Sequence, residues 1–378
     1  MAAPRVAPPH RRPTGSPPPG RARRRFPLPL AAVLALLPPA LFLWVVLFVS
    51  PTSAAGNVTF TVNSTSDESD ANTADLICKS TPSGVCTLRA AIEQANKPSG
   101  INPWTTATIV VPGGTYTLTK GQLNILATLA SVTVQGAGPT ATIIDGNGSS
   151  PNCYPFGSLS CRIFDMKNGS TLVASGMTIR NGQAGLGESN HYHGGGIHNH
   201  GSLQLSNAIV SDNVVSAANW GGGGITTAGG ASSDLENVSI IRNKAKANGG
   251  GIENFGGLSA RVATISDNSA EGLGGGIWQN SSTFSSIRYT TVAYNLAPGQ
   301  NGGGINRSGG VPLYVSDSIL SGNLSQGCIG ALNSLGFNVS SDPSCALSNP
   351  TDKNSTDPKL GGLQDNGGGL PTRRPGPT

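Results

Sequence analysis

Gly-Gly-Gly-Ile occurs five times in this chain, at Gly194–Ile197, Gly222–Ile225, Gly249–Ile252, Gly274–Ile277 and Gly302–Ile305. Successive isoleucines lie 25 to 28 residues apart. A second pattern, an aliphatic residue three places before an asparagine, keeps the same period and ends at Asn213, Asn243, Asn268, Asn295 and Asn323. Two motifs with one period predict a repeat architecture in which each unit stacks on its neighbours.

The residues between these motifs favour strands over helices. Three consecutive glycines oppose a helix, because each glycine inside a helix costs about 1 kcal/mol relative to alanine. Residues 202–207 and 312–317 alternate apolar and polar side chains, as half-buried strands do. A unit of this length holds three short strands and three turns at about 3.3 Å per residue. The sequence therefore predicts an all-β protein with a parallel β-helix.

Each repeated residue has a structural role in such a coil. We expect the glycines to turn tight corners that need a positive φ. The isoleucine after each triplet points inward and stacks on the next one. The asparagine lies at another corner, where it bonds backbone groups or forms a ladder. A glycine-rich phosphate loop is the alternative, but it needs a following helix, and no helix is predicted there.

The basic charge of the chain comes from its first 55 residues. The 378-residue sequence has a formal net charge of +5, and residues 1–55 hold seven arginines without any Lys, Asp or Glu. The remainder carries 17 basic and 19 acidic residues. Charge therefore gives no reason to expect a nucleic-acid partner.

Residues 1–55 have the features of an export segment. They are basic and proline-rich to Arg25, apolar to Val49, and end in Ser53-Ala54-Ala55, a small-x-small cleavage pattern. A cleaved signal peptide is our first interpretation. An uncleaved anchor is the alternative, because residues 31–49 approach the length of a membrane span. Both predict a secreted or cell-surface protein that meets a membrane only through this segment.

The cysteines agree with export. Six cysteines allow 15 pairings, and bonds between sequence neighbours are the simplest arrangement in an oxidising compartment. A zinc site is the alternative, but no Cys-x-x-Cys is present. We predict three local disulfides, Cys78–Cys86, Cys153–Cys161 and Cys328–Cys345.

One helix is predicted, over residues 87–96. Thr87 is a suitable N-cap, and an apolar stripe at helical spacing is formed by Leu88, Ala91, Ile92 and Ala95. Arg89 and Glu93 lie four residues apart, and we expect them to pair on the exposed side; a catalytic carboxylate at Glu93 is the alternative. Because a repeat stack needs a terminal cap, we place this helix over the open end of the coil.

These elements divide the chain into four segments. Residues 1–55 form a signal peptide or anchor, and residues 56–107 form the N-terminal cap with its helix. Residues 108–325 form the β-helix. Residues 326–378 form a C-terminal disulfide loop and a tail.

Several of these motifs resemble known families. Cys86–Ile92 is similar to the Cys-Ser-Leu-Arg-Glu-Ala-Ile pattern of bacterial CSLREA-domain proteins, although Ala90 stands in the place of Glu. The repeats resemble the right-handed parallel β-helix of the pectate-lyase-like superfamily and the repeats of chlamydial polymorphic outer-membrane proteins. Residues 357–368 are similar to the tail called choice-of-anchor Q. Because the sequence after residue 368 departs from that family's pattern, we expect the anchor to be incomplete. Together the resemblances cover residues 57–368 and imply a bacterial protein with a right-handed coil.

The histidines outside the leader form the best local candidate for a site. They are His191, His193, His198 and His200. Alternate residues of a strand share a face, so each closely spaced pair can present its imidazoles together, as a metal site requires. Only Glu188 lies nearby as a further ligand. We therefore interpret the cluster as a polar loop and corner, and predict no metal or cofactor.

A second candidate is a column of charges. Asp212, Arg242 and Asp267 occupy one position in three successive units and should stack about 4.8 Å apart. This is either a small catalytic cluster or a surface ladder of alternating charge, and an arginine between two acids opposes Ca²⁺ binding. Glu253 and Trp278 directly follow inward isoleucines, so we expect Trp278 to face outward as a sugar platform or as an exposed aromatic. No catalytic residue is assigned.

These observations favour an exported scaffold without catalysis. The polar residues at equivalent corners are mostly Asn, Ser and Thr, whereas glycoside hydrolases need two carboxylates about 5–9.5 Å apart. We expect a monomer that serves adhesion or glycan binding, with polysaccharide as its partner. The alternative is a polysaccharide lyase or glycoside hydrolase of the pectate-lyase-like superfamily. A third hypothesis, the passenger domain of a secretion system, is weakened because we find no C-terminal barrel strands.

Overall fold

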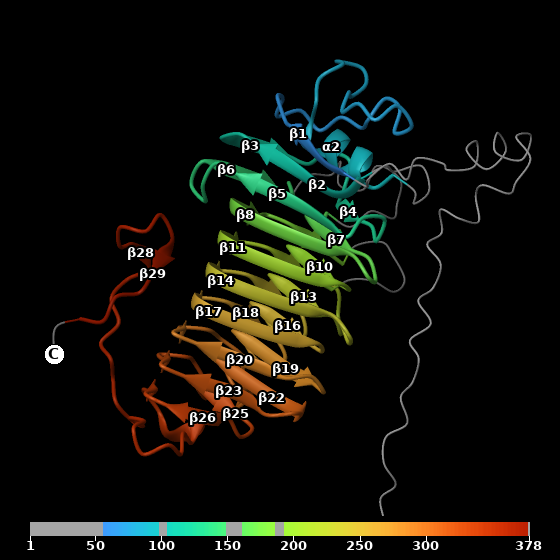
Figure 1. Cartoon of the computed structure of the whole chain (residues 1–378). Coiled ribbons are helices and arrows are strands. Elements are labelled where there is room, and N and C mark those ends of the chain that lie inside the picture. Colours follow the sequence, from blue (N-terminus) through green and yellow to red (C-terminus); the bar gives the residue numbers. More distant parts are fainter. Residues whose placement is uncertain (1–55, 98–103, 149–160, 186–192, 377–378) are drawn as a thin grey trace, which may run out of the picture. The chain divides into compact units, whose positions relative to one another are not determined.

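The described part of the protein is a parallel coil of strands. The computed structural model describes residues 56–97, 104–148, 161–185 and 193–376, all within the compact unit Ser53–Thr378. The strands wind through about seven turns, and Figure 1 shows them stacked in chain order from β2 to β26. This confirms the all-β parallel β-helix. The predicted leader lies outside the described residues.

The largest sheet of the described chain collects the long strands of each turn. All its pairings are parallel, in the order β1-β2-β5-β8-β11-β14-β17-β20-β23-β26 with shorter strands beside this path. Its strands are β1 (Gly56–Thr61), β2 (Trp104–Val111), β3 (Gly114–Thr117), β5 (Ser131–Gly136), β6 (Thr142–Asp145), β8 (Thr171–Arg180), β11 (Ser202–Ser211), β14 (Ser232–Ile241), β17 (Gly257–Ser266), β20 (Ser285–Arg288), β21 (Thr291–Ala293), β23 (Leu313–Ser316), β24 (Ile319–Ser321), β26 (Asn333–Gly336) and β27 (Val339–Ser340).

Two further parallel sheets close the coil. One contains β4 (Leu123–Ile125), β7 (Phe164–Met166), β10 (Ile197–Asn199), β13 (Ile225–Thr227), β16 (Ile252–Asn254), β19 (Ile277–Ser281), β22 (Ile305–Gly310) and β25 (Cys328–Ile329). The other contains β9 (Gln183–Ala184), β12 (Val214–Val215), β15 (Lys244–Ala245) and β18 (Ser269–Ala270). A separate antiparallel hairpin pairs β28 (Gln364–Asp365) with β29 (Pro371–Thr372).

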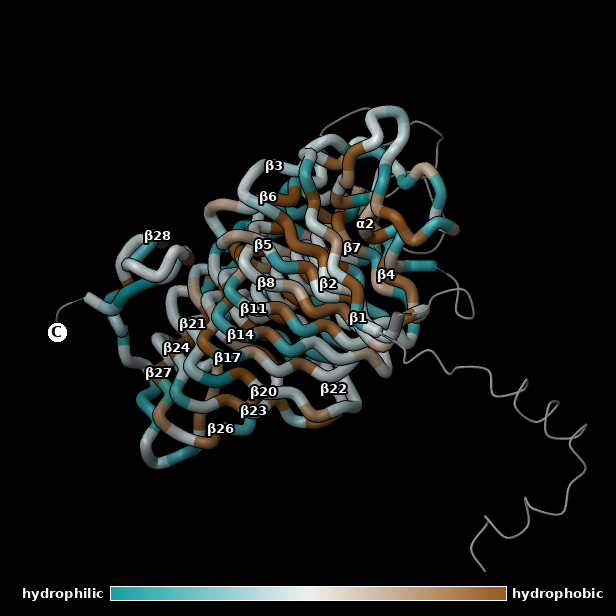
Figure 2. The backbone as a smooth tube through the Cα atoms, turned by 45° about the horizontal axis from the view of Figure 1, so that its top comes forward, coloured by the Kyte–Doolittle hydropathy of each residue, from teal (hydrophilic) through white to brown (hydrophobic). Residues whose placement is uncertain are grey.

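The repeated isoleucines form the core as predicted. Ile252 pairs with Ile225 on one side and with Ile277 on the other, and all three are fully buried. Alternate residues of the long strands face the same core, and Figure 2 shows the resulting alternation of hydropathy along β8, β11 and β14. The apolar face of one turn is thus covered by the turns beside it.

Glycine is required at the corners for two different reasons. Gly249 has a φ of +63°, which favours glycine. Gly250 has no positive φ, but a Cβ there would lie 2.4 Å from the carbonyl oxygen of Gly275 on the next turn. Our expectation of a positive φ is therefore confirmed for Gly249 and wrong for Gly250. Gly250 must be a glycine because neighbouring turns approach too closely there to leave room for a side chain.

The asparagines form a ladder through the core. Asn243 Nδ2 donates to Asn268 Oδ1 at 3.0 Å, and Asn268 Nδ2 donates to Asn295 Oδ1 at 3.0 Å. The same Oδ1 atoms also accept the backbone N–H of the previous asparagine. These three side chains are fully buried. The ladder satisfies polar groups that the corner would otherwise bury unpaired.

The predicted helix is present as α2 (Leu88–Ala95), with Thr87 as its N-cap. Its apolar stripe is buried in the main core, while its role as the cap of the coil stays a prediction. The expected exposed pair of Arg89 and Glu93 is wrong. The preceding loop folds over this side, so Arg89 is buried against Asp67 at 2.6 Å and Glu93 accepts the N–H of Asp70 at 2.7 Å.

Two of the three predicted disulfides are confirmed. Cys78 bonds Cys86, and Cys328 bonds Cys345 beside the short 3-10 helix η4 (Pro343–Cys345). The third prediction involves Cys153, which lies outside the described residues. Both observed bonds join cysteines that are close in sequence, so each fixes one loop at an end of the described coil.

Candidate functional site

A column of mostly polar residues runs along the outer face of the second sheet. Each member follows an inward residue and therefore points to the opposite face. Strand register places the members opposite one another, because β4, β7, β10, β13, β16, β19 and β22 pair in turn. The outer column consists of Asn124, Asp165, His198, Thr226, Glu253, Trp278 and Asn306.

The first charged cluster of the outer column surrounds Asp165. Arg162 Nη1 lies 3.3 Å from Asp165 Oδ1, Lys167 Nζ pairs with Asp165 Oδ2, and Gln122 donates to Oδ2 at 2.9 Å. Burial alone raises the pKa of Asp165, but its polar contacts with His198, Arg162 and Lys167 outweigh burial and hold the pKa well below the usual range. Asp165 is therefore a fixed carboxylate and not a proton donor.

His198 is a neutral imidazole in this cluster. It is 3% exposed, and burial lowers its pKa to about 3. Arg162 Nη1 lies 2.6 Å from His198 Nδ1. The same Nδ1 also lies 3.2 Å from Asp165 Oδ1, so His198 stands between the guanidinium and the carboxylate. On the other side of the ring, His198 Nε2 lies 2.9 Å from the Nε2 of His200.

The second charged group of the outer column is Glu253. Its Oε2 lies 2.5 Å from His193 Nδ1 and accepts from Thr226 Oγ1 at 3.2 Å. Glu253 is 2% exposed, and the His193 ring packs edge-on against Trp220 with centroids 4.4 Å apart. The buried carboxylate is thus held by donors from two other segments.

Trp278 differs from our expectation. It lies on the outer face, as predicted, but is only 7% exposed, which excludes an exposed aromatic. Its ring and that of Phe255 pack in a T-shaped arrangement with centroids 5.0 Å apart, and Nε1 donates to Ser308 at 2.8 Å. The flat face that a sugar would need is not presented as an open platform.

The predicted column of charges exists, but its pairing is asymmetric. Arg242 Nε and Nη2 donate to the two oxygens of Asp212 at 2.8 and 2.9 Å. Asp267 is held by Arg373 of the C-terminal tail, with both oxygens at 2.8 Å from Nη2. Burial raises the pKa of Asp212, yet hydrogen bonds from Arg242 and Ser211 lower it overall.

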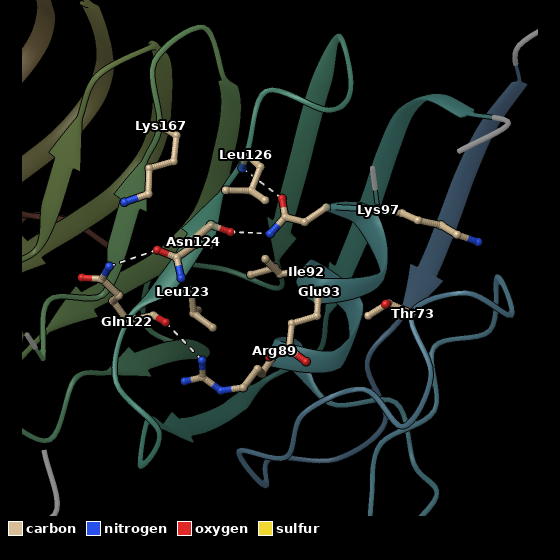
Figure 3. A pocket seen from close by; sticks show the side chains of 11 residues that line it. Thr73, Arg89, Ile92, Glu93, Lys97, Gln122, Leu123, Asn124, Leu126 and Lys167 are labelled. Carbon is tan, nitrogen blue, oxygen red and sulfur yellow. Dashed lines mark hydrogen bonds between the residues drawn. The ribbon is translucent and has the colours of Figure 1, made fainter. Parts of the chain in front are cut away.

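An open pocket lies between α2 and the start of the second sheet. It measures about 570 Å³. Figure 3 shows Arg89 and Glu93 on the helix side and Gln122 and Asn124 on the strand side, with apolar groups between them. Asn96 closes its rim by donating to the Asn124 carbonyl at 2.6 Å. Amide, carboxylate and ammonium groups around an apolar floor suit a polyhydroxylated ligand.

The pocket continues into the Asp165 cluster. Gln122 Nε2 contacts both Asn124 Oδ1, at 3.0 Å, and Asp165 Oδ2, at 2.9 Å. Lys167 lines the pocket and also pairs with Asp165, while half of its side chain stays exposed. A ligand in the pocket would therefore meet an ammonium group whose position is set by the outer column.

The structure unites some of the predicted site residues and not others. His193 and His198 stack with ring centroids 5.8 Å apart, and His198 contacts His200. His191 and Glu188 lie outside the described residues. In the part of the chain that is described, no group of three His, Cys, Asp or Glu residues could hold a metal ion.

The outer column could have been found from the sequence. Its members from His198 to Asn306 are the single variable residue after each Gly-Gly-Gly-Ile motif. The sequence analysis named His198, Glu253 and Trp278. It missed the other members of the column, which are Asn124, Asp165, Thr226 and Asn306. Asp165 lies in an irregular turn before the first Gly-Gly-Gly-Ile motif, so the sequence does not show that it is equivalent to the later members of the column. Thr226 follows such a motif, but a threonine alone suggests no chemistry.

Comparison with family models, curated proteins and solved structures finds no match to this chain. The described segments contain no helix that is both long and apolar enough to cross a membrane. The resemblances to CSLREA-domain and pectate-lyase-like proteins therefore rest on the sequence motifs alone. Of the features that they imply, the structure confirms the parallel β-helix.

Proposed function

We propose that this protein is an exported β-helix scaffold, secreted or held at the cell surface, which binds polysaccharide without cleaving it. The observation that carries the proposal is the pairing of the acids that line its outer faces. Asp165 is held by Arg162 and Lys167, and Asp212 by Arg242. A general acid needs a pKa raised toward the working pH, whereas the pKa values of both acids are lowered.

The spacing of the outer column also opposes glycoside hydrolysis. Asp165 and Glu253 are separated by three strand steps, from β7 to β16. At about 4.8 Å per step this places their backbones about 14 Å apart. Paired catalytic carboxylates stand about 5–9.5 Å apart, so these two acids do not form such a pair.

The pocket beside α2 is the proposed glycan site. It joins the hydrogen-bonding groups of Asn124 and Gln122 to the partly exposed side chain of Leu126, while the other apolar residues of its lining, Ile92 and Leu123, lie buried beneath. Sugars present hydroxyls at their edges and C–H groups on their faces, so this combination matches both. Lys167 adds a cationic group at the rim, half of which is exposed.

A polysaccharide panel tests the proposal. The mature chain is applied to immobilised neutral and acidic polysaccharides, and the same mixtures are assayed for reducing ends and unsaturated products. We expect binding to at least one polymer without product release. Release of either product would establish the enzyme alternative, and absence of binding across the panel would refute the glycan-binding proposal.

Matched variants locate the binding site. Asn124→Ala and Lys167→Met should each weaken binding about threefold to tenfold, the loss expected when one ligand hydrogen bond is removed. Asn333→Ala and Lys246→Met change exposed side chains of the same types elsewhere on the coil and should leave binding unchanged. Equal losses in all four variants would place the site elsewhere.

A further inference from the structure

The C-terminal residues form a small hairpin with its own internal order. Strand β28 pairs with β29, and the Asp365 carboxylate accepts the N–H groups of Gly367, Gly368 and Gly369 at 2.8 to 3.0 Å. Asn366 Nδ2 donates to Thr372 Oγ1 at 2.8 Å across the hairpin. These contacts fix the loop that carries Leu370, so the hairpin presents a defined shape.

Leu370 lies against an apolar spot on the outer face of the largest sheet. It is 4% exposed and packs with Ile209 of β11 and Ile241 of β14. Both isoleucines occupy outward positions, because each is next in its strand to a core residue. Ile209 precedes Val210, and Ile241 follows Ile240. They are nevertheless only 8% and 1% exposed, so the leucine completes an apolar cluster outside the coil.

Polar contacts follow directly beside this apolar cluster. Ser239 Oγ of β14 donates to the Pro371 carbonyl at 2.7 Å. One turn further along, Arg373 Nε donates to Ser266 Oγ at 2.8 Å, and Nη2 lies 2.8 Å from both oxygens of Asp267. The hairpin therefore contacts β11, β14 and β17 in succession.

An aromatic ring completes the arginine site. The Arg373 guanidinium stands 4.1 Å from the centroid of Tyr294, a cation–π arrangement. The Arg373 side chain is only 10% exposed. A carboxylate, a hydroxyl and an aromatic face thus meet one guanidinium, which is the chemistry of an arginine-recognition pocket.

We propose that the outer face of β11, β14 and β17 is a peptide-recognition surface for a hairpin carrying leucine and arginine three residues apart, and that residues 359–376 of the same chain are its ligand. Leu370 supplies the apolar anchor, and Arg373 supplies the ionic one. Because it contacts three successive turns, the docked hairpin holds the middle turns of the coil together. Figure 1 shows this segment returning from β26 along the stack.

Trypsin digestion of the full chain tests the docking. Trypsin binds an arginine side chain in a pocket with an aspartate, so cleavage after Arg373 requires Arg373 to leave Asp267. Mass spectrometry follows release of the pentapeptide that begins at Arg374. Asp267→Asn should accelerate this release about tenfold, as expected for loss of a charge-assisted hydrogen-bonded pair. Asp234→Asn, at an exposed aspartate of β14, should leave the rate unchanged.

A second variant separates docking from the ionic contact. Leu370→Ser keeps Arg373 and its partners but removes the apolar anchor, and should also accelerate release. Unchanged rates in both Asp267→Asn and Leu370→Ser would refute the recognition surface. Protection that disappears on dilution of the unmodified chain would show that the hairpin comes from a second copy, which would overturn the assignment to the same chain.

Discussion

Asn243 and Asn268 are joined twice between neighbouring turns of the coil. Both the side-chain Nδ2 of Asn243, at 3.0 Å, and its backbone N–H, at 2.9 Å, donate to Oδ1 of Asn268. Asn268 Nδ2 also donates to the carbonyl of Ile240 at 2.9 Å. The side-chain amide of Asn268 therefore provides hydrogen-bond partners for buried polar groups of the neighbouring turn, inside a core where water cannot replace it.

We predict that Asn268→Ala destabilises the protein by at least about 3 kcal/mol, because each buried group left without a partner costs about 1–3 kcal/mol. The substitution strips partners from the Asn243 amide and the Ile240 carbonyl. Denaturant unfolding followed by circular dichroism measures the change. Asn333→Ala, at an exposed position, serves as the control and should change the free energy of unfolding by less than about 0.5 kcal/mol.

The stacked isoleucines give a second stability prediction. Ile252→Ala should cost about 2–5 kcal/mol, the range for truncating a buried isoleucine, since Ile252 is fully buried between Ile225 and Ile277. Ile77→Ala removes the same atoms from a side chain that is 58% exposed and should be nearly neutral. Similar losses in the two variants would contradict the assignment of Ile252 to the core.

His198 predicts a loss of stability in mild acid. Its folded pKa is lowered to about 3 by burial, whereas an unfolded histidine titrates near 6.5. Between these values the unfolded chain binds the extra proton, so stability falls as the pH falls through this window, by at most about 1.4 kcal/mol per pH unit. Denaturation midpoints at a series of pH values measure this slope.

His198→Gln provides the comparison for this titration. Glutamine keeps a polar side chain but does not bind a proton in this window, so the slope between about pH 6 and pH 4.5 should become shallower. Carboxylates contribute mainly below this range, because the unfolded forms titrate near 4. An identical slope in both proteins would show that His198 does not stay neutral in the folded state.

The proposed export predicts a defined N-terminus for the mature chain. The small-x-small pattern Ser53–Ala55 predicts cleavage before Gly56. Mass spectrometry of protein recovered from the culture medium or cell surface should find a chain that begins near Gly56. An intact Met1 in a membrane fraction would instead support the uncleaved anchor.

The repeat determined the fold at the level of sequence. The inward isoleucine and the corner asparagine recur at one period, and each needs only the adjacent copy as its partner, as Ile252 and Asn268 demonstrate. In a coil of stacked turns, a contact between turns joins residues whose separation is simply the period. The pattern therefore predicts spatial neighbours as well as strands.

The tertiary structure alone decided the chemistry of the outer surfaces. The pairing of Arg89 with Asp67, of His193 with Glu253 and of Asp267 with Arg373 joins segments outside the repeat period. No local pattern specifies such contacts, because loops and the tail reach the coil by paths that the repeat does not encode. The same aspartate type is a half-exposed surface group at Asp212 and a nearly buried one at Asp165, and only folding, by setting burial and nearby charges, fixes what each carboxylate can do.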